Sequence, residues 1–142
     1  MSYAIDLNVL VLASNAAAPE YTDAVSFLEE CAARPEILCL AWPTVMGYLR
    51  ITTHPSIFSR PLSTREALTN IRSLLALPQT RALGEEEGFF AVYENVAGRS
   101  VRGNLVPDAH LAAILLQHGV TTLYTRDADF RRFDFLEVRD PF

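Results

Sequence analysis

An unbroken apolar run at residues 37–41 restricts the possible folds more than any other feature of the chain. It reads Ile-Leu-Cys-Leu-Ala, without polar alternation, which is typical of a central parallel strand covered on both faces. Further strands are expected at residues 3–5, 80–83, 122–125 and 135–138. Because helical segments separate these strands, the sequence predicts an α/β fold with a central parallel sheet covered by helices on both faces.

Helices are predicted between the strands from apolar spacing and from capping signals. Ser63 and Glu66 have the spacing of a capping box, and Pro19 and Pro43 suit the first turn of a helix. We expect a short helix after Asp6, a loop at 98–103 and a turn at 127–133. The longer helices are expected at 18–34, 43–52, 63–77, 85–96 and 107–117. Without internal repeats or a linker, residues 1–142 are expected to form a single domain.

The composition argues against several classes of function. Half of the residues are hydrophobic and the net charge is −5, which argues against broad non-specific binding of nucleic acid. All twelve basic residues are arginine, so mechanisms that need a catalytic lysine are excluded. There is no basic leader and no apolar stretch long enough for a membrane span, so we expect a soluble cytoplasmic protein. Cys31 and Cys39 are expected to be buried core residues.

Three aspartates are predicted to meet at one edge of the sheet. Asp6 ends the first strand, Asp127 follows the strand at 122–125, and Asp108 opens the helix that leads into that strand. Ligands of such sheets bind beyond the carboxyl ends of the strands, and the handedness of the crossovers allows all three residues to lie there. Carboxylates that meet repel one another unless they are protonated or bridged by a cation.

Oxygen ligands favour Mg²⁺ or Mn²⁺ over Zn²⁺. Such an ion can activate water and orient a phosphodiester, so the pattern favours metal-dependent phosphodiester hydrolysis. Each aspartate also has a structural interpretation: Asp6 and Asp127 as caps, and Asp108 as an acid that stabilises the first turn of a helix. We expect His110 to be a partly exposed helix residue and His118 to interact with the carboxyl end of its helix.

The sequence resembles the PIN-domain ribonucleases, and within them the VapC toxins of bacterial toxin–antitoxin systems, in particular a mycobacterial-type branch. The resemblance covers essentially the whole chain. Its matching segments occur in the expected order: Ile5-Asp6-Leu7-Asn8, Leu49-Arg50-Ile51-Thr52-Thr53-His54-Pro55, Gly103-Asn104-Leu105-Val106-Pro107-Asp108-Ala109-His110-Leu111-Ala112-Ala113, and Thr125-Arg126-Asp127-Ala128-Asp129-Phe130.

This resemblance implies a three-layer α/β/α PIN fold and Mg²⁺- or Mn²⁺-dependent endonucleolytic cleavage of RNA, with tRNA or rRNA as the target. It implies that Asp6, Asp108 and Asp127 are the catalytic, metal-binding residues. It also implies that Asp129 is an additional acid at the metal, and that Asn8 and Thr125 support the site. The partners implied are a VapB-like antitoxin and a second copy of the chain, with a homodimer expected to form through helices between Ala18 and Leu77.

One position departs from the family pattern. The glutamate usual in the helix after the second strand is replaced by Gly47, which leaves open whether one or two metal ions bind and whether Asp129 compensates. Arginines cluster in sequence around the aspartates, and Arg102 and Arg126 are candidates for RNA phosphate contacts. The alternative is that these arginines are solvated or paired with Asp129, Asp134 and Glu137.

Three functions are compatible with these features. The first is a metal-dependent endoribonuclease toxin. The second is a catalytically weak or inactive PIN domain that binds RNA or protein, suggested by Gly47. The third is a phosphate-transfer or receiver-like domain, which also gathers carboxylates around Mg²⁺ but relies on a lysine that this chain lacks.

Overall fold

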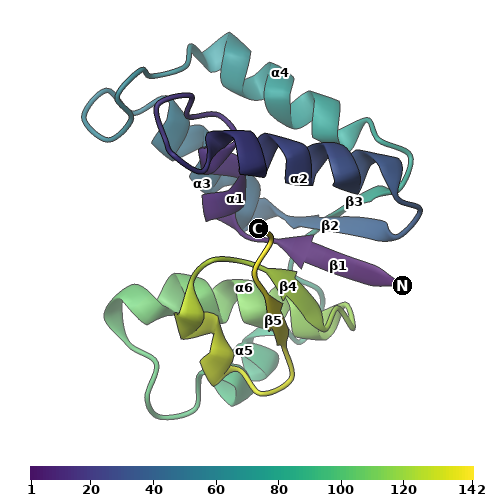
Figure 1. Ribbon diagram of the computed structural model, residues 1–142. Coiled ribbons are helices and arrows are strands. Elements are labelled where there is room, and N and C mark those ends of the chain that lie inside the picture. The colour runs from purple at the N-terminus through teal and green to yellow at the C-terminus, as the bar shows by residue number, and fades with distance from the viewer.

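The computed structural model describes residues 1–142 and contains one five-stranded, fully parallel sheet (Figure 1). The strand order is β3-β2-β1-β4-β5, so the first strand lies at the centre. The strands are β1 (Ser2–Ile5), β2 (Ile37–Ala41), β3 (Thr80–Leu83), β4 (Thr122–Tyr124) and β5 (Glu137–Arg139). The parallel sheet predicted from the apolar runs is confirmed.

Helices form a layer on each side of the sheet. The α-helices are α1 (Leu7–Leu12), α2 (Tyr21–Ala33), α3 (Trp42–Thr52), α4 (Thr64–Leu75), α5 (Phe89–Ala97) and α6 (Val106–Gln117). In Figure 1, α2 and α4 lie above the sheet and α5 and α6 lie below it. Two short 3₁₀ helices, η1 (Gly103–Leu105) and η2 (Ala128–Arg132), precede α6 and follow β4.

One apolar core lies on each face of the sheet, and successive side chains of β1 point alternately into the two cores. Tyr3 and Ile5 pack with α1, α2, α3 and α4, whereas Ala4 packs with α6 and η2 on the opposite face. Cys31 and Cys39 are buried in these cores, as expected.

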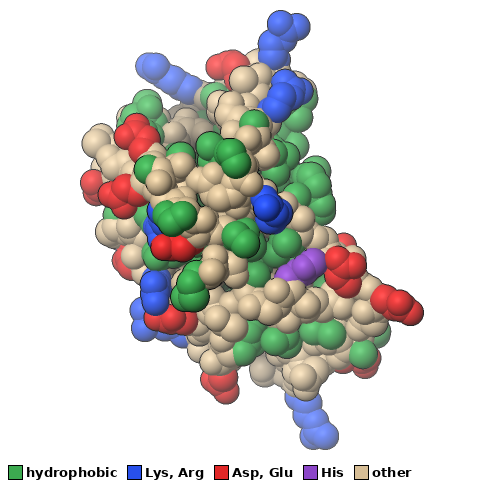
Figure 2. Space-filling model, turned by 90° about the vertical axis from the view of Figure 1, so that its right-hand side faces the viewer, with side chains coloured by type: hydrophobic (Ala, Val, Ile, Leu, Met, Phe, Trp, Pro, Cys, Tyr) green, Lys and Arg blue, Asp and Glu red, His purple; other side chains and the backbone are tan.

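None of the helices is long and apolar enough to cross a lipid bilayer. On the face drawn in Figure 2, apolar side chains extend across the middle, with charged side chains around them.

The local signals place most helix ends correctly. Ser63 Oγ accepts a hydrogen bond from Glu66 N (3.0 Å) and Glu66 Oε1 accepts one from Ser63 N (3.1 Å), which confirms the capping box. The start predicted for α2 at residue 18 was wrong, because turns occupy the preceding residues and the helix begins at Tyr21.

Two other boundaries also differ from the prediction. α5 begins at Phe89 and not at residue 85, because Gly88 adopts a left-handed conformation (φ 81°) and Gln117 Oε1 holds Glu86 N at 2.9 Å. β5 begins at Glu137 and not at residue 135, because a turn closed by Leu136 N and Phe133 O (3.0 Å) comes first.

The helix α6 is buried on nearly all sides. It packs against α5, α3 and the sheet. Consequently it fixes the backbone of Asp108, which lies in its first turn. Its buried residues are Ala109, Leu111, Ala112, Ala113, Ile114 and Leu115.

Candidate active site

Asp6 is held at the carboxyl end of β1 by three hydrogen bonds. Its backbone N donates to Tyr124 O (3.0 Å), which joins the ends of β1 and β4. Its Oδ1 accepts from Leu7 N (2.7 Å) as the N-cap of α1, and its Oδ2 accepts from Thr125 Oγ1 (2.8 Å). Asp6 is therefore both a helix cap and an oriented carboxylate at the edge where ligands are expected.

Thr125 connects the two ends of the chain. Besides donating to Asp6, its Oγ1 accepts hydrogen bonds from Asp127 N (3.0 Å) and from Asn8 Nδ2 (3.4 Å). Asn8 thus reaches the aspartates through Thr125, and its Oδ1 is buried without a hydrogen-bond partner. The buried hydroxyl of Thr125 fixes the relative positions of the residues that follow β1 and β4.

Three further carboxylates converge beside this network. Asp108 comes from the first turn of α6, while Asp127 and Asp129 come from the start of η2, where Asp127 Oδ1 accepts from Asp129 N (2.9 Å). One oxygen from each of these three residues lies within 4.8 Å of the other two. Asp6 is outside this group, although it is close enough for its charge to act on Asp108.

Electrostatics at this cluster disfavour three bare negative charges. The pKa of Asp108 is raised to about 6, mainly by burial and in addition by the charges of Asp127, Asp6 and Asp129, while Arg132 opposes the shift. Burial also raises the pKa of Asp6, and the hydrogen bonds from Thr125 and Leu7 oppose this increase. Raised carboxyl pKa values in a group of acids are a physical sign of a functional site, because a cation relieves the repulsion.

The donor atoms fit a hard divalent cation. All are carboxylate oxygens, the ligands that Mg²⁺ and Mn²⁺ prefer. Opposite ligands of an octahedral Mg²⁺ are separated by about 4.2 Å, twice its usual bond length. The Asp108, Asp127 and Asp129 oxygens, within 4.8 Å of one another, have a spacing of this order.

The helix α3 contributes no carboxylate to the cluster. A Cβ built on Gly47 would lie 2.9 Å from Leu7 Cδ2, closer than real contacts allow. The glycine therefore permits the close packing of α3 against α1. Leu7 fills the space beside Gly47 where the first carbons of a longer side chain would lie.

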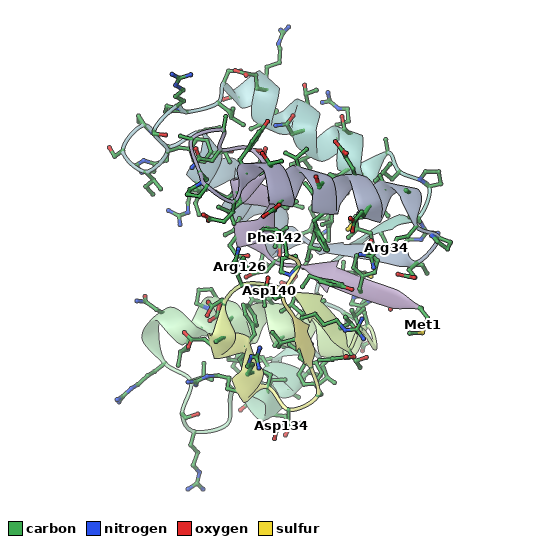
Figure 3. All side chains as sticks on the ribbon, viewed as in Figure 1. Met1, Arg34, Arg126, Asp134, Asp140 and Phe142 are labelled. Carbon is green, nitrogen blue, oxygen red and sulfur yellow. The ribbon has the colours of Figure 1, made fainter.

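The arginines expected near the site have different surroundings. Arg126 Nε lies 3.7 Å from Asp140 Oδ1, and its guanidinium lies over the Phe142 ring at 5.0 Å from the centroid. Figure 3 shows these three labelled side chains together near the end of β1. Of the predicted acidic partners, Glu137 pairs instead with Arg139 (2.8 Å). Arg102 is exposed, immediately before η1.

Two of the three histidines, His110 and His118, contact the loop before α5. His110 is partly exposed, as predicted, and its Nε2 lies 2.6 Å from Glu85 Oε1. His118 is the C-cap of α6, where its Nε2 lies 2.9 Å from Gly84 O. Sequence inspection did not identify the Glu85 and Asp140 contacts, because these pairs form only when distant segments come together.

No family model matches the chain, but individual known proteins show which family it belongs to. It is 43% identical over 143 residues to ribonuclease VapC48 of Mycobacterium tuberculosis, covering 100% of this chain and 99% of that protein. Its fold matches M. tuberculosis VapC20, described as a sarcin-ricin loop cleaving toxin (TM-score 0.70, 17% identity, 96% and 98% of the two chains).

A second structural match is the VapBC2 complex of Rickettsia felis bound to a promoter DNA fragment, with a TM-score of 0.70 and 15% identity over 99% of this chain and 98% of that chain. The fold matches support the architecture, and the full-length identity to VapC48 establishes the relationship. The chain belongs to the VapC family of PIN-domain ribonucleases.

Proposed function

We propose that this protein is a Mg²⁺- or Mn²⁺-dependent endoribonuclease that acts in the cytoplasm as the toxin of a VapBC-type pair, cleaving tRNA or rRNA and so inhibiting translation. The observation that carries the proposal is the convergence of the Asp108, Asp127 and Asp129 carboxylates beside Asp6. Four acids at one sheet edge fit phosphodiester hydrolysis, in which a negatively charged substrate must approach water and a cation together.

The residues of the site have separate tasks in this proposal. A cation bound by Asp108, Asp127 and Asp129 would supply a polarised water and offset charge on the phosphate. Asp6, oriented by Thr125 and Leu7, accepts hydrogen bonds from groups at the edge of the cluster. Arg126 can exchange its long, exposed contact with Asp140 for an RNA phosphate.

Cleavage of purified RNA tests the reaction. The protein should cut tRNA or rRNA in the presence of Mg²⁺ or Mn²⁺, and a chelator should stop the cleavage. The Asp108→Asn variant should cleave at least about a hundredfold more slowly, which is the loss expected for a group that acts at the reacting atoms. Asp134→Asn removes an exposed acid outside the cluster and serves as the control. Cleavage that survives Asp108→Asn would rule out this site. Because the structural match VapC20 is described as a sarcin-ricin loop cleaving toxin, rRNA is one of the first substrates to test.

Metal binding can be measured without RNA. Titration calorimetry with Mn²⁺ should show binding that Asp129→Asn weakens by about ten- to a hundredfold and that Asp134→Asn leaves unchanged. Binding of Mn²⁺ and RNA without cleavage would instead support a catalytically inactive RNA-binding domain. The specific observation that favours this second function is that α3 carries no acid and that Leu7 occupies the space where a side chain at Gly47 would begin.

We further propose a VapB-like antitoxin as partner. The R. felis structural match is a toxin–antitoxin complex, and this chain has an apolar groove of about 340 Å³ between α2 and α4. Val25, Leu28 and Leu74 line the groove, and Tyr48 OH bonds Ser14 Oγ (2.7 Å) and Asn70 Nδ2 (2.9 Å) within it. Expression of the chain should arrest growth, and co-expression of its antitoxin should relieve the arrest.

A further inference from the structure

Arg126, which lies between Thr125 and Asp127 in the sequence, is supported by the segment that follows β5 (Figure 3). The central carbon of its guanidinium lies 5.0 Å from the centroid of the Phe142 ring, and its Nε lies 3.7 Å from Asp140 Oδ1. The same carboxylate oxygen accepts a hydrogen bond from Phe142 N (3.1 Å). Asp140 therefore contacts both the arginine and the residue whose ring faces it.

The Phe142 ring is itself fixed by the core on the α2 side of the sheet. Its centroid lies 6.5 Å from that of Phe27, which is buried on α2, and the ring packs against the core that contains Phe27. The backbone is also held at the end of β5, because Thr125 N donates a hydrogen bond to Arg139 O (3.0 Å). The position of the ring is thus determined by packing that does not involve the arginine.

The guanidinium of Arg126 has donors available for another partner. Its contact with Asp140 is longer than a hydrogen bond, and the two side chains are 39% and 58% exposed, so this ion pair holds the arginine only weakly. A guanidinium over an aromatic face can still use the N–H groups at its rim for a bidentate contact with a phosphate. The ring and a phosphate can therefore contact Arg126 together, whereas Asp140 competes with the phosphate.

We propose that Phe142 is a positioning residue, which holds the guanidinium of Arg126 where it binds a phosphate of the RNA next to the cleaved bond. This inference rests on the proposed function, because it requires an RNA strand at the aspartates. An exposed arginine loses rotational freedom when it binds, and a support that already restricts the side chain reduces this loss. Phe142 thus acts on RNA affinity through Arg126 and has no part in metal binding.

RNA binding measured without cleavage tests this role. In an Asp108→Asn background with chelator, Phe142→Leu should lower the affinity for a fluorescent sarcin-ricin loop RNA by about two- to tenfold, because it removes the ring and keeps an apolar side chain. Phe142→Tyr keeps the ring and should restore the affinity. Phe135→Leu removes a partly buried ring from the opposite core and is the matched control. In proteins that retain Asp108, Mn²⁺ affinity should be equal in all three variants.

The substitution Arg126→Gln separates positioning from packing. It should lower RNA affinity and reduce the slope of log affinity against log salt by about one, the change expected for one lost phosphate contact. In this background Phe142→Leu should cause no further loss, because the ring has no guanidinium to hold.

Three results would overturn the proposal: a wild type that binds no RNA, an unchanged affinity in Phe142→Leu, or the same loss from Phe142→Leu with and without Arg126. RNA that is bound through Arg126 and Phe142 but never cleaved would instead contradict the endoribonuclease activity and support the positioning role.

Discussion

Thr125 Oγ1 donates a hydrogen bond to Asp6 Oδ2 at 2.8 Å, across 119 positions of sequence. Replacement by valine removes this donor and the acceptor for Asp127 N, and leaves buried polar groups without partners. We expect Thr125→Val to lower RNA cleavage and Mn²⁺ affinity by about ten- to a hundredfold, as for other residues that orient metal ligands. Thr125→Ser keeps the hydroxyl and should restore most of both. Equal losses in the two variants would contradict this role.

The raised pKa of Asp108 predicts that the site destabilises the metal-free protein. Because the pKa is 3.8 for a free side chain and about 6 in the folded chain, the folded state binds more protons between these values. Stability therefore falls as pH rises through this window. In the presence of chelator, Asp108→Asn should raise Tm near pH 7.5 by about 2–4 °C and have little effect near pH 4. Asp134→Asn should show no such pH-dependent difference.

Gly47 and Leu7 should be energetically coupled. Replacing glycine by alanine inside a helix usually stabilises it by about 0.5–1 kcal/mol. Here the new Cβ would meet Leu7 Cδ2, so Gly47→Ala should give no gain in the wild type but the usual gain in a Leu7→Ala background. Denaturant unfolding of the four proteins in this double-mutant cycle measures the coupling. The same gain in both backgrounds would show that Leu7 moves aside freely.

The groove between α2 and α4 predicts a separation of toxin activity from antitoxin binding. Leu28→Arg places a charge among apolar lining residues, so it should weaken antitoxin binding by about tenfold or more while RNA cleavage continues. Ser26→Arg, on the exposed side of α2, should change neither. Calorimetry with the purified antitoxin provides the affinities. If Leu28→Arg binds normally, the antitoxin contacts another surface.

Local sequence signals were sufficient for much of the fold. The apolar run at residues 37–41 and the capping box at Ser63 were interpreted correctly, because their causes lie within a few residues. The start of α5 was wrong because Gln117, some 30 positions away, holds the preceding loop. The start of β5 was wrong because a turn closed by Phe133 and Leu136 replaces its first residues.

Parts of the candidate site could likewise be predicted from the sequence, and other parts could not. Topology alone was enough to expect Asp6, Asp108 and Asp127 at one sheet edge, since the ends of β1 and β4 and the first turn of α6 determine their positions. The supporting role of Thr125 came from the family resemblance, because spacing does not reveal which hydroxyl faces which carboxylate. The Asp140 and Phe142 contacts of Arg126 could not be predicted, because they arise where the segment after β5 folds back over the end of β1.

The burial of α6 on nearly all sides has a consequence for genetics. Most of its positions tolerate neither added volume nor polarity, so substitutions at residues such as Ala112 should abolish function by unfolding the chain. A selection for survivors of toxin expression would then recover many alleles in this helix. Only a measurement of protein abundance would distinguish those alleles from changes at Asp108, which lies on the same helix and should leave the amount of folded protein undiminished.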